Sequence, residues 1–242
     1  LVDDTWLFVD IMNGVLKDRK LNGISIDDYR NVFDFPVQDY YRKLGFNFED
    51  EPFESAGLDF IKIYDTRKFE AQLFGDTLST LNTLKELGCN HSILSAQNII
   101  TLKKSVSHYR LDSMFEHVSG LEDHYAIGKV DQGKNLINNL NLHSDQVAMI
   151  GDTEHDYEVA EAMGVKCFLM NRGHNSTERL MSKQEDVFDS FPELLTVLSQ
   201  TLIFVHLFVL IRQVATTAKT TICNPNDNHG PQNGIPHLIP VK

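Results

Sequence analysis

Apolar residues in the first 70 positions recur at helical spacing. Those at positions 7, 8, 11, 15 and 16 share one face of a helix. Ser25 is a typical N-cap with Asp28 three residues later, and Gly45 is a typical helix end. Helices are expected at about residues 3–20, from Ser25 onward, at 37–44 and at 52–68. The pattern predicts a helical unit over residues 1–70.

From residue 71 to about 200, short apolar runs alternate with amphipathic stretches. Strands are expected at 92–95, 115–119, 147–150, 165–170 and 187–189. Helices are expected at 77–87, 98–109, 130–141, 155–163 and 192–199. This alternation is typical of βαβ units, which build a parallel sheet with helices on both faces. We therefore predict an α/β core over residues 71–200.

Residues 201–242 continue neither pattern. Leu202–Ile211 is apolar and rich in β-branched residues, which favours a strand. From Ala215 onward Thr, Asn, Pro and His dominate without any period. That composition predicts disorder for the last stretch.

Composition narrows the function classes. The 242 residues carry a formal net charge of -12, which argues against a nucleic-acid partner because phosphate contacts need clustered Lys and Arg. Anionic small substrates stay open, since local charge decides their binding. The 3 widely spaced cysteines favour a reducing, cytoplasmic compartment. No part of residues 1–242 reads as a secretory signal, and the longest apolar run is about half the length of a membrane span. The oligomeric state is left open.

The sharpest chemical signal is Gly151-Asp152-Thr153-Glu154-His155-Asp156, directly after an apolar strand. Ligands of open parallel sheets bind at the carboxyl ends of the strands, where this loop must lie. Two carboxylates there suit Mg²⁺, which prefers oxygen ligands. The plainer alternative makes Asp152 a turn residue and Asp156 a helix N-cap.

Two further residues are expected at strand-to-helix junctions. Ser95 ends a strand, and Ala96 and Gln97 follow at a helix start, where a hydroxyl and free backbone N–H groups cradle phosphate. Lys129 stands at a loop-to-helix boundary, where its ammonium neutralises a phosphate. Alone, each residue is as well explained by an N-cap serine or a solvated lysine.

Taken together, Ser95, Lys129 and the pair Asp152 and Asp156 resemble motifs two, three and four of the haloacid dehalogenase phosphatase superfamily. The resemblance covers about residues 1–198 and implies a Rossmann-like core with an inserted helical cap. Details such as Gly120–Asp123 resemble the phosphoglycolate phosphatase branch. It also implies Mg²⁺-dependent hydrolysis of a small phosphorylated metabolite through an aspartyl phosphate. Asp152 and Asp156 would form the metal site, Ser95, Ala96 and Gln97 would bind phosphate, and Lys129 would balance charge.

The superfamily's first motif, D-x-[DN]-G-T, is not found in this sequence. Asp10 and Asn13 are spaced three apart instead of two, in a segment of helical period. A better alignment sets Leu1–Asp4 directly after that motif, so we expect the nucleophile, the general acid and the first, central strand to be missing.

Three interpretations follow: an incomplete, inactive phosphatase, a non-catalytic binding or interaction module, and a chain with no stable function. Leu202–Ile211 either fills the vacant central strand or packs loosely outside the sheet, and we favour loose packing. His174 and the cap residues Arg30, Arg42 and Lys43 are weaker site candidates, expected to be exposed to solvent.

Overall fold

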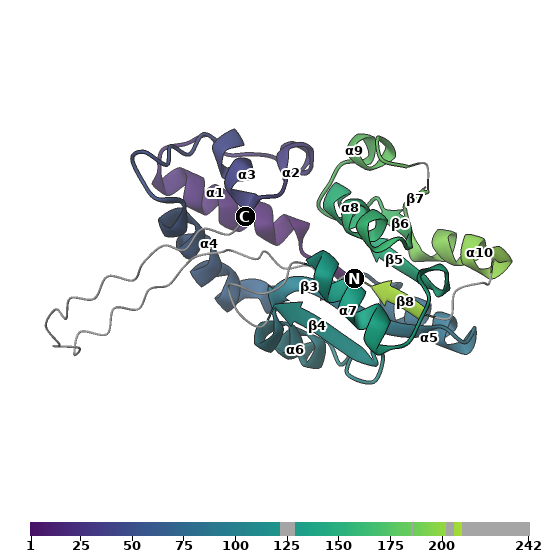
Figure 1. Ribbon diagram of the computed structural model, residues 1–242. Coiled ribbons are helices and arrows are strands. Elements are labelled where there is room, and N and C mark those ends of the chain that lie inside the picture. Colours follow the sequence, from purple (N-terminus) through teal and green to yellow (C-terminus); the bar gives the residue numbers. More distant parts are fainter. Residues whose placement is uncertain (122–128, 185, 202–205, 210–242) are drawn as a thin grey trace, which may run out of the picture.

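The structure is a computed structural model that describes residues 1–121, 129–184, 186–201 and 206–209. Figure 1 shows a group of helices at one side of an α/β layer structure. None of the helices described is long and apolar enough to cross a membrane. The disorder expected from residue 215 onward lies outside the described residues.

The helical unit consists of α1 (Thr5–Asp18), α2 (Ile26–Val32), α3 (Val37–Lys43) and α4 (Phe53–Arg67), followed by the 3₁₀ turn η1 (Lys68–Glu70). Ser25 and Asp28 form a reciprocal capping box at the start of α2, as the sequence predicts. Aromatic side chains fill the core of this unit, and Tyr29, Tyr40 and Tyr41 are its largest fully buried residues. These helices thus bury an apolar core of their own.

A short antiparallel ribbon connects the helical unit to the rest of the chain. β1 (Val2–Asp3) precedes α1, and β2 (Gln72–Leu73) follows η1. Val2 pairs with Leu73 and Asp3 with Gln72. The ribbon was not predicted, because two-residue strands leave no period to read. It brings the two ends of the helical unit together.

The main sheet has the order β4-β3-β8-β5-β6-β7 and all its pairs are parallel. Its strands are β3 (Asn90–Asn98), β4 (His117–Leu121), β5 (Val147–Gly151), β6 (Lys166–Met170), β7 (Val187–Phe188) and β8 (His206–Val209). The helices are α5 (Thr77–Glu86), α6 (Ile99–His108), α7 (Lys129–Asn139), α8 (Glu154–Met163), α9 (Thr177–Met181) and α10 (Phe191–Thr201), with the 3₁₀ turn η2 (Ser144–Gln146) before β5. The predicted α/β fold is confirmed.

Alternating side chains of the parallel strands enter two different cores. Ile93 and Ile150 join a cluster with residues of α5, α6 and α10. Leu94 and Met149 point the other way, into a cluster with α7, α8 and α9. Helices therefore cover both faces, as expected of parallel strands that are apolar throughout.

The central strand, β8, comes from the far end of the chain. Its residues His206–Val209 pair in parallel with Asn90–Ile93 of β3 and with Val147–Ile150 of β5. Figure 1 shows this short strand between β5 and β3. The favoured expectation of loose packing is wrong for these residues. A gap between β3 and β5 would leave both strands with unpaired backbone groups, so the segment that pairs with both is strongly favoured there.

Helix ends are the best predicted local features. Gly45, Gly88 and Gly164 adopt positive φ of 94°, 86° and 72°. Glycine accepts this conformation without strain, so each stops a helix and turns the chain. The short helix α9 was not predicted, because five residues are too few to show a helical period.

Replacing Leu207 by Pro tests the central strand. Proline removes a ladder N–H and leaves a carbonyl of a neighbouring strand unpaired, so we expect a loss of about 2–4 kcal/mol in the free energy of unfolding. Leu207→Val, which keeps the N–H, is the control. Urea denaturation measures both, and equal stability of the two variants would contradict the central position of β8.

Candidate active site

The predicted site residues gather at the carboxyl ends of the central strands. Val209 of β8 is level with Ile93 of β3 and with Ile150 of β5. Ser95 and Asp152 each lie two residues beyond these partners, so they are level with each other. They stand on the two strands that flank β8, at about 10 Å from strand to strand. The sheet therefore brings motif-two and motif-four residues to one edge.

Asp156 is fully engaged by neighbouring groups. Its Oδ2 accepts the backbone N–H groups of Asp152 and Thr153 at 2.9 and 3.1 Å. Its Oδ1 accepts from Lys129 Nζ at 2.7 Å. Thr153, not Asp156, caps α8, with Asp156 as the reciprocal partner three residues later. The carboxylate of Asp156 thus holds the loop after β5 and the start of α7 together.

Lys129 begins α7 and is almost completely buried with its partner. The side chains of Lys129 and Asp156 are 6% and 1% exposed. The alternative interpretation of Lys129 as a solvent-exposed surface lysine is therefore wrong. The ion pair joins α7 to the loop after β5.

Asp152 has a more open carboxylate. The backbone N–H of His174 donates to its Oδ2 at 2.9 Å, and no residue that the structure describes bonds to its Oδ1. Gly173 lies so close that a Cβ there would stand 1.8 Å from Asp152 Oδ2. The site thus needs glycine at this position, and Asp152 keeps one oxygen for a ligand.

The phosphate cradle expected at Ser95 differs from its prediction. β3 continues through Asn98, which caps α6 by accepting the N–H groups of Ile100 and Thr101. Ala96 and Gln97 are therefore extended and do not start a helix. The N–H of Gln97 donates to Ser95 Oγ at 3.1 Å, so this N–H already has a partner within the segment. Local sequence missed this because pairing with β4 shifts register between Leu94 and Asn98.

His174 is buried, contrary to expectation, and 3% of its area is exposed. Its Nδ1 lies 2.7 Å from Tyr29 Oη, and its Nε2 lies 3.2 Å from Asp4 Oδ1. Asp4 and Tyr29 were not predicted as site residues. Asp4 belongs to no recognisable motif, and Tyr29 looks like an ordinary core residue on the apolar face of α2, so neither pointed to a site. Only the packing of the helical unit on the loop after β6 reveals them.

Arg172 is a third residue that the sequence did not suggest. Its guanidinium carbon lies 4.2 Å from the ring centroids of both Phe74 and Phe191. Its Nη1 donates to both carboxylate oxygens of Asp76 at 2.8 Å. A pocket at the strand ends is lined by Arg172, Asp152, His174 and Asp4, among others. Arg172 lies just after β6, at the carboxyl end of a parallel strand, and that position could have marked it as a site residue.

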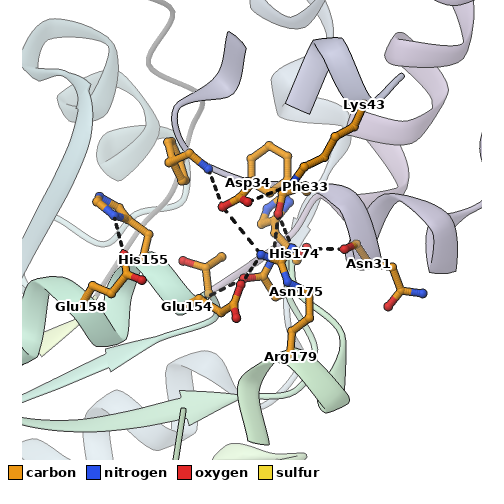
Figure 2. A network of polar contacts seen from close by, with 12 residues as sticks. Asn31, Phe33, Asp34, Lys43, Glu154, His155, Glu158, His174, Asn175 and Arg179 are labelled. Carbon is orange, nitrogen blue, oxygen red and sulfur yellow. Dashed lines mark hydrogen bonds and ion pairs between the residues drawn. The ribbon is translucent and has the colours of Figure 1, made fainter. Parts of the chain in front are cut away.

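A polar network joins the helical unit to the core beside this pocket (Figure 2). Arg179 of α9 donates to the carbonyl of Phe33 and pairs with Glu154 of α8. Asp34 accepts from Lys43 at 2.9 Å and lies 3.7 Å from Arg179. Burial opposes ionisation of Asp34 most strongly, but the hydrogen bonds from Lys43 and the Phe35 N–H hold its pKa below the usual value. The network fixes α2 against α8 and α9.

Of the other candidates in the helical unit, Arg42 forms an exposed pair with Asp39, and Arg30 donates to the carbonyl of Gly173 at 3.0 Å. Arg30 therefore takes part in the contact between the helical unit and the core, although it was expected to be merely solvated. Lys43 stays exposed, as expected, and pairs with Asp34 inside the helical unit. Asp10 is exposed on α1 and pairs with Arg67. That position excludes Asp10 from the strand ends.

A family model of haloacid dehalogenase-like hydrolases matches residues 1–170. The chain belongs to this family. The phosphoglycolate phosphatase of Aliivibrio fischeri is 29% identical over 132 residues, 53% of this chain and 58% of that protein. Enolase-phosphatase E1 of Shewanella denitrificans is 25% identical over 119 residues, 48% and 53% of the two chains. The chain thus spans a little over half the length of the curated relatives it matches.

A solved haloacid dehalogenase-like hydrolase from Streptococcus pneumoniae has the same fold, with a TM-score of 0.70. It is 18% identical, and the match covers 81% of this chain and 92% of that chain. The family match ends at residue 170. It therefore includes Ser95, Lys129 and Asp152, while the loop after β6 and the strand β8 lie beyond it.

Removing the Lys129 charge tests the buried pair of this hydrolase-family chain. Lys129→Met leaves the Asp156 carboxylate buried without its cation, and we expect a loss of about 3–5 kcal/mol in the free energy of unfolding. Lys183→Met, which breaks the exposed pair with Glu158, is the matched control with an expected change of at most about 1 kcal/mol. Similar urea midpoints for the two variants would show that Lys129 is not held as described.

Proposed function

We propose that the strand ends bind the phosphoryl group of a small phosphomonoester together with Mg²⁺, as in a haloacid dehalogenase-type phosphatase. The observation that carries the proposal is the carboxylate of Asp152, which has one oxygen held by a backbone N–H and the other open. Asp152 and Ser95 follow the two strands that flank β8, one on each side of it. The names of the curated relatives support a phosphatase, and phosphoglycolate is the proposed substrate type.

The residues fit Mg²⁺ through Asp152. Magnesium keeps several waters and takes only one or two carboxylates, with substrate phosphate oxygens completing its shell. Among the residues described, no group of three or more His, Cys, Asp or Glu side chains could hold a metal. Asp152 would therefore hold the ion, while Asp156 orients the loop through the N–H of Asp152. When bound, the ion would polarise a phosphoryl oxygen.

The remaining roles follow from the contacts of each residue. Ser95 Oγ and Ala96 N–H would donate to phosphate oxygens, since Gln97 N–H is already bonded to Ser95. Lys129 would offset the charge that gathers at the strand ends while held by Asp156. The helical unit would act as a cap over the pocket. Its position beside Asp152 allows it to exclude water from a bound substrate.

Turnover requires a carboxylate nucleophile, which the family resemblance places on the central strand. Here the central strand is β8, and the sequence holds no Asp or Glu between Glu193 and Asp227. We therefore propose that residues 1–242 bind phosphate and Mg²⁺ without hydrolysing the ester. An incomplete phosphatase and a non-catalytic binding module are both consistent with this absence.

Mg²⁺ binding is tested by thermal unfolding with MgCl₂ and inorganic phosphate. A ligand of the native state at 100 times its Kd adds about 2.7 kcal/mol of stability. Asp152→Asn should abolish this gain. Asp145→Asn removes an exposed carboxylate just before β5, at the opposite end of that strand, and should keep it. A gain that survives in Asp152→Asn would contradict the proposed metal site.

Hydrolysis is tested with p-nitrophenyl phosphate and phosphoglycolate in the presence of Mg²⁺. We expect no turnover above the uncatalysed rate, because motif one is not found in residues 1–242 and β8 carries no carboxylate. Turnover that disappears in Asp152→Asn would support the phosphatase site but contradict its proposed inactivity. The same variants serve both measurements, so binding and chemistry are separated.

A further inference from the structure

The loop from Gly173 to Ser176 contacts the helical unit along its whole length. The carbonyl of Gly173 accepts from Thr5 Oγ1 at 3.2 Å and from Arg30 Nε at 3.0 Å. Asn175 Nδ2 donates to the carbonyl of Phe33 at 3.1 Å, and Ser176 N–H donates to the carbonyl of Arg30 at 3.2 Å. The loop is therefore hydrogen-bonded to α1, to α2 and to the residue that follows α2.

The same loop also holds Asp152. The N–H of His174 donates to Asp152 Oδ2, and the N–H of Asn175 donates to the carbonyl of Asp152 at 3.3 Å. Asn175 Oδ1 accepts the N–H of Glu154 at 2.9 Å. Two consecutive residues therefore fix both the backbone and the side chain of Asp152.

The His174 ring connects these two sets of contacts. Both ring nitrogens are bonded to groups from the N-terminal part of the chain, Tyr29 of α2 and Asp4 just before α1. The Phe8 ring meets it edge-on at 4.8 Å between centroids. These contacts fix the orientation of the ring, and hence the position of the backbone N–H that Asp152 accepts. Packing alone would leave the two nitrogens unsatisfied in a buried place.

We propose that His174 is a positioning residue that couples the helical unit to Asp152. Through it, the hydrogen bond from Tyr29 sets the orientation of the Asp152 carboxylate and thereby its affinity for a divalent cation. This inference rests on the proposed function of Asp152 as the metal ligand. Groups that orient a ligand from outside the metal shell typically change metal affinity about 10–100-fold when removed. Tyr29 acts one step further away, so its effect is smaller.

The test compares two buried tyrosines of the helical unit. Tyr29→Phe removes the hydroxyl that bonds His174 and keeps the ring in its aromatic cluster. Tyr40→Phe is the matched control, because Tyr40 is equally buried and its hydroxyl bonds to no residue that the structure describes. Isothermal titration with MgCl₂ on the full chain should give an affinity about 5–10-fold weaker for Tyr29→Phe and less than about twofold changed for Tyr40→Phe. Equal affinities would overturn the coupling.

A second readout separates this inference from the proposed metal site. In chains with ¹³C-labelled aspartate carboxyl groups, Asp152→Asn identifies the Asp152 resonance without any added metal. Tyr29→Phe should shift this resonance and Tyr40→Phe should leave it in place, while an unshifted resonance in Tyr29→Phe overturns the coupling. Absence of Mg²⁺ binding in the unmodified chain would instead refute the metal site. A folded far-UV spectrum of Tyr29→Phe shows that the change is local.

Discussion

The backbone of a parallel sheet must be paired on both sides at its centre, and the rest of this structure depends on how that requirement is met. β3 and β5 each present N–H and C=O groups toward the position between them, and His206–Val209 pairs with both. Buried backbone groups without partners are costly, so an open position there would expose the two strands that carry Ser95 and Asp152. Because β8 lies between these two strands, it sets the distance between Ser95 and Asp152.

Around this centre, the site is fixed by a second set of buried polar contacts. The Asp156 carboxylate accepts hydrogen bonds from the loop after β5 and from the first residue of α7. The Gly173–Ser176 loop connects Asp152 to the helical unit. Few of these contacts involve solvent-exposed charges. The arrangement is therefore one connected scaffold, in which the position of α2 bears directly on a carboxylate at the strand ends.

Local patterns predicted the parts of the fold that local physics decides. The sequence predicted the Ser25 capping box, the glycine helix ends and the apolar strand before Asp152, because each depends on residues a few positions apart. β8 was recognised as strand-like but was expected outside the sheet, since its partners β3 and β5 both lie far earlier in the chain. The burial of His174 and the engagement of Asp156 by Lys129 also arise from long-range packing, which no period reveals.

Amide hydrogen exchange on the full chain, read by mass spectrometry, tests the central claim most directly. The account predicts that residues 206–209 exchange as slowly as 91–94 of β3 and 147–150 of β5, because central strands open only with global unfolding. Fast exchange at 206–209 with slow exchange in β3 and β5 would contradict it. The centre of the sheet would then be held by something other than this segment.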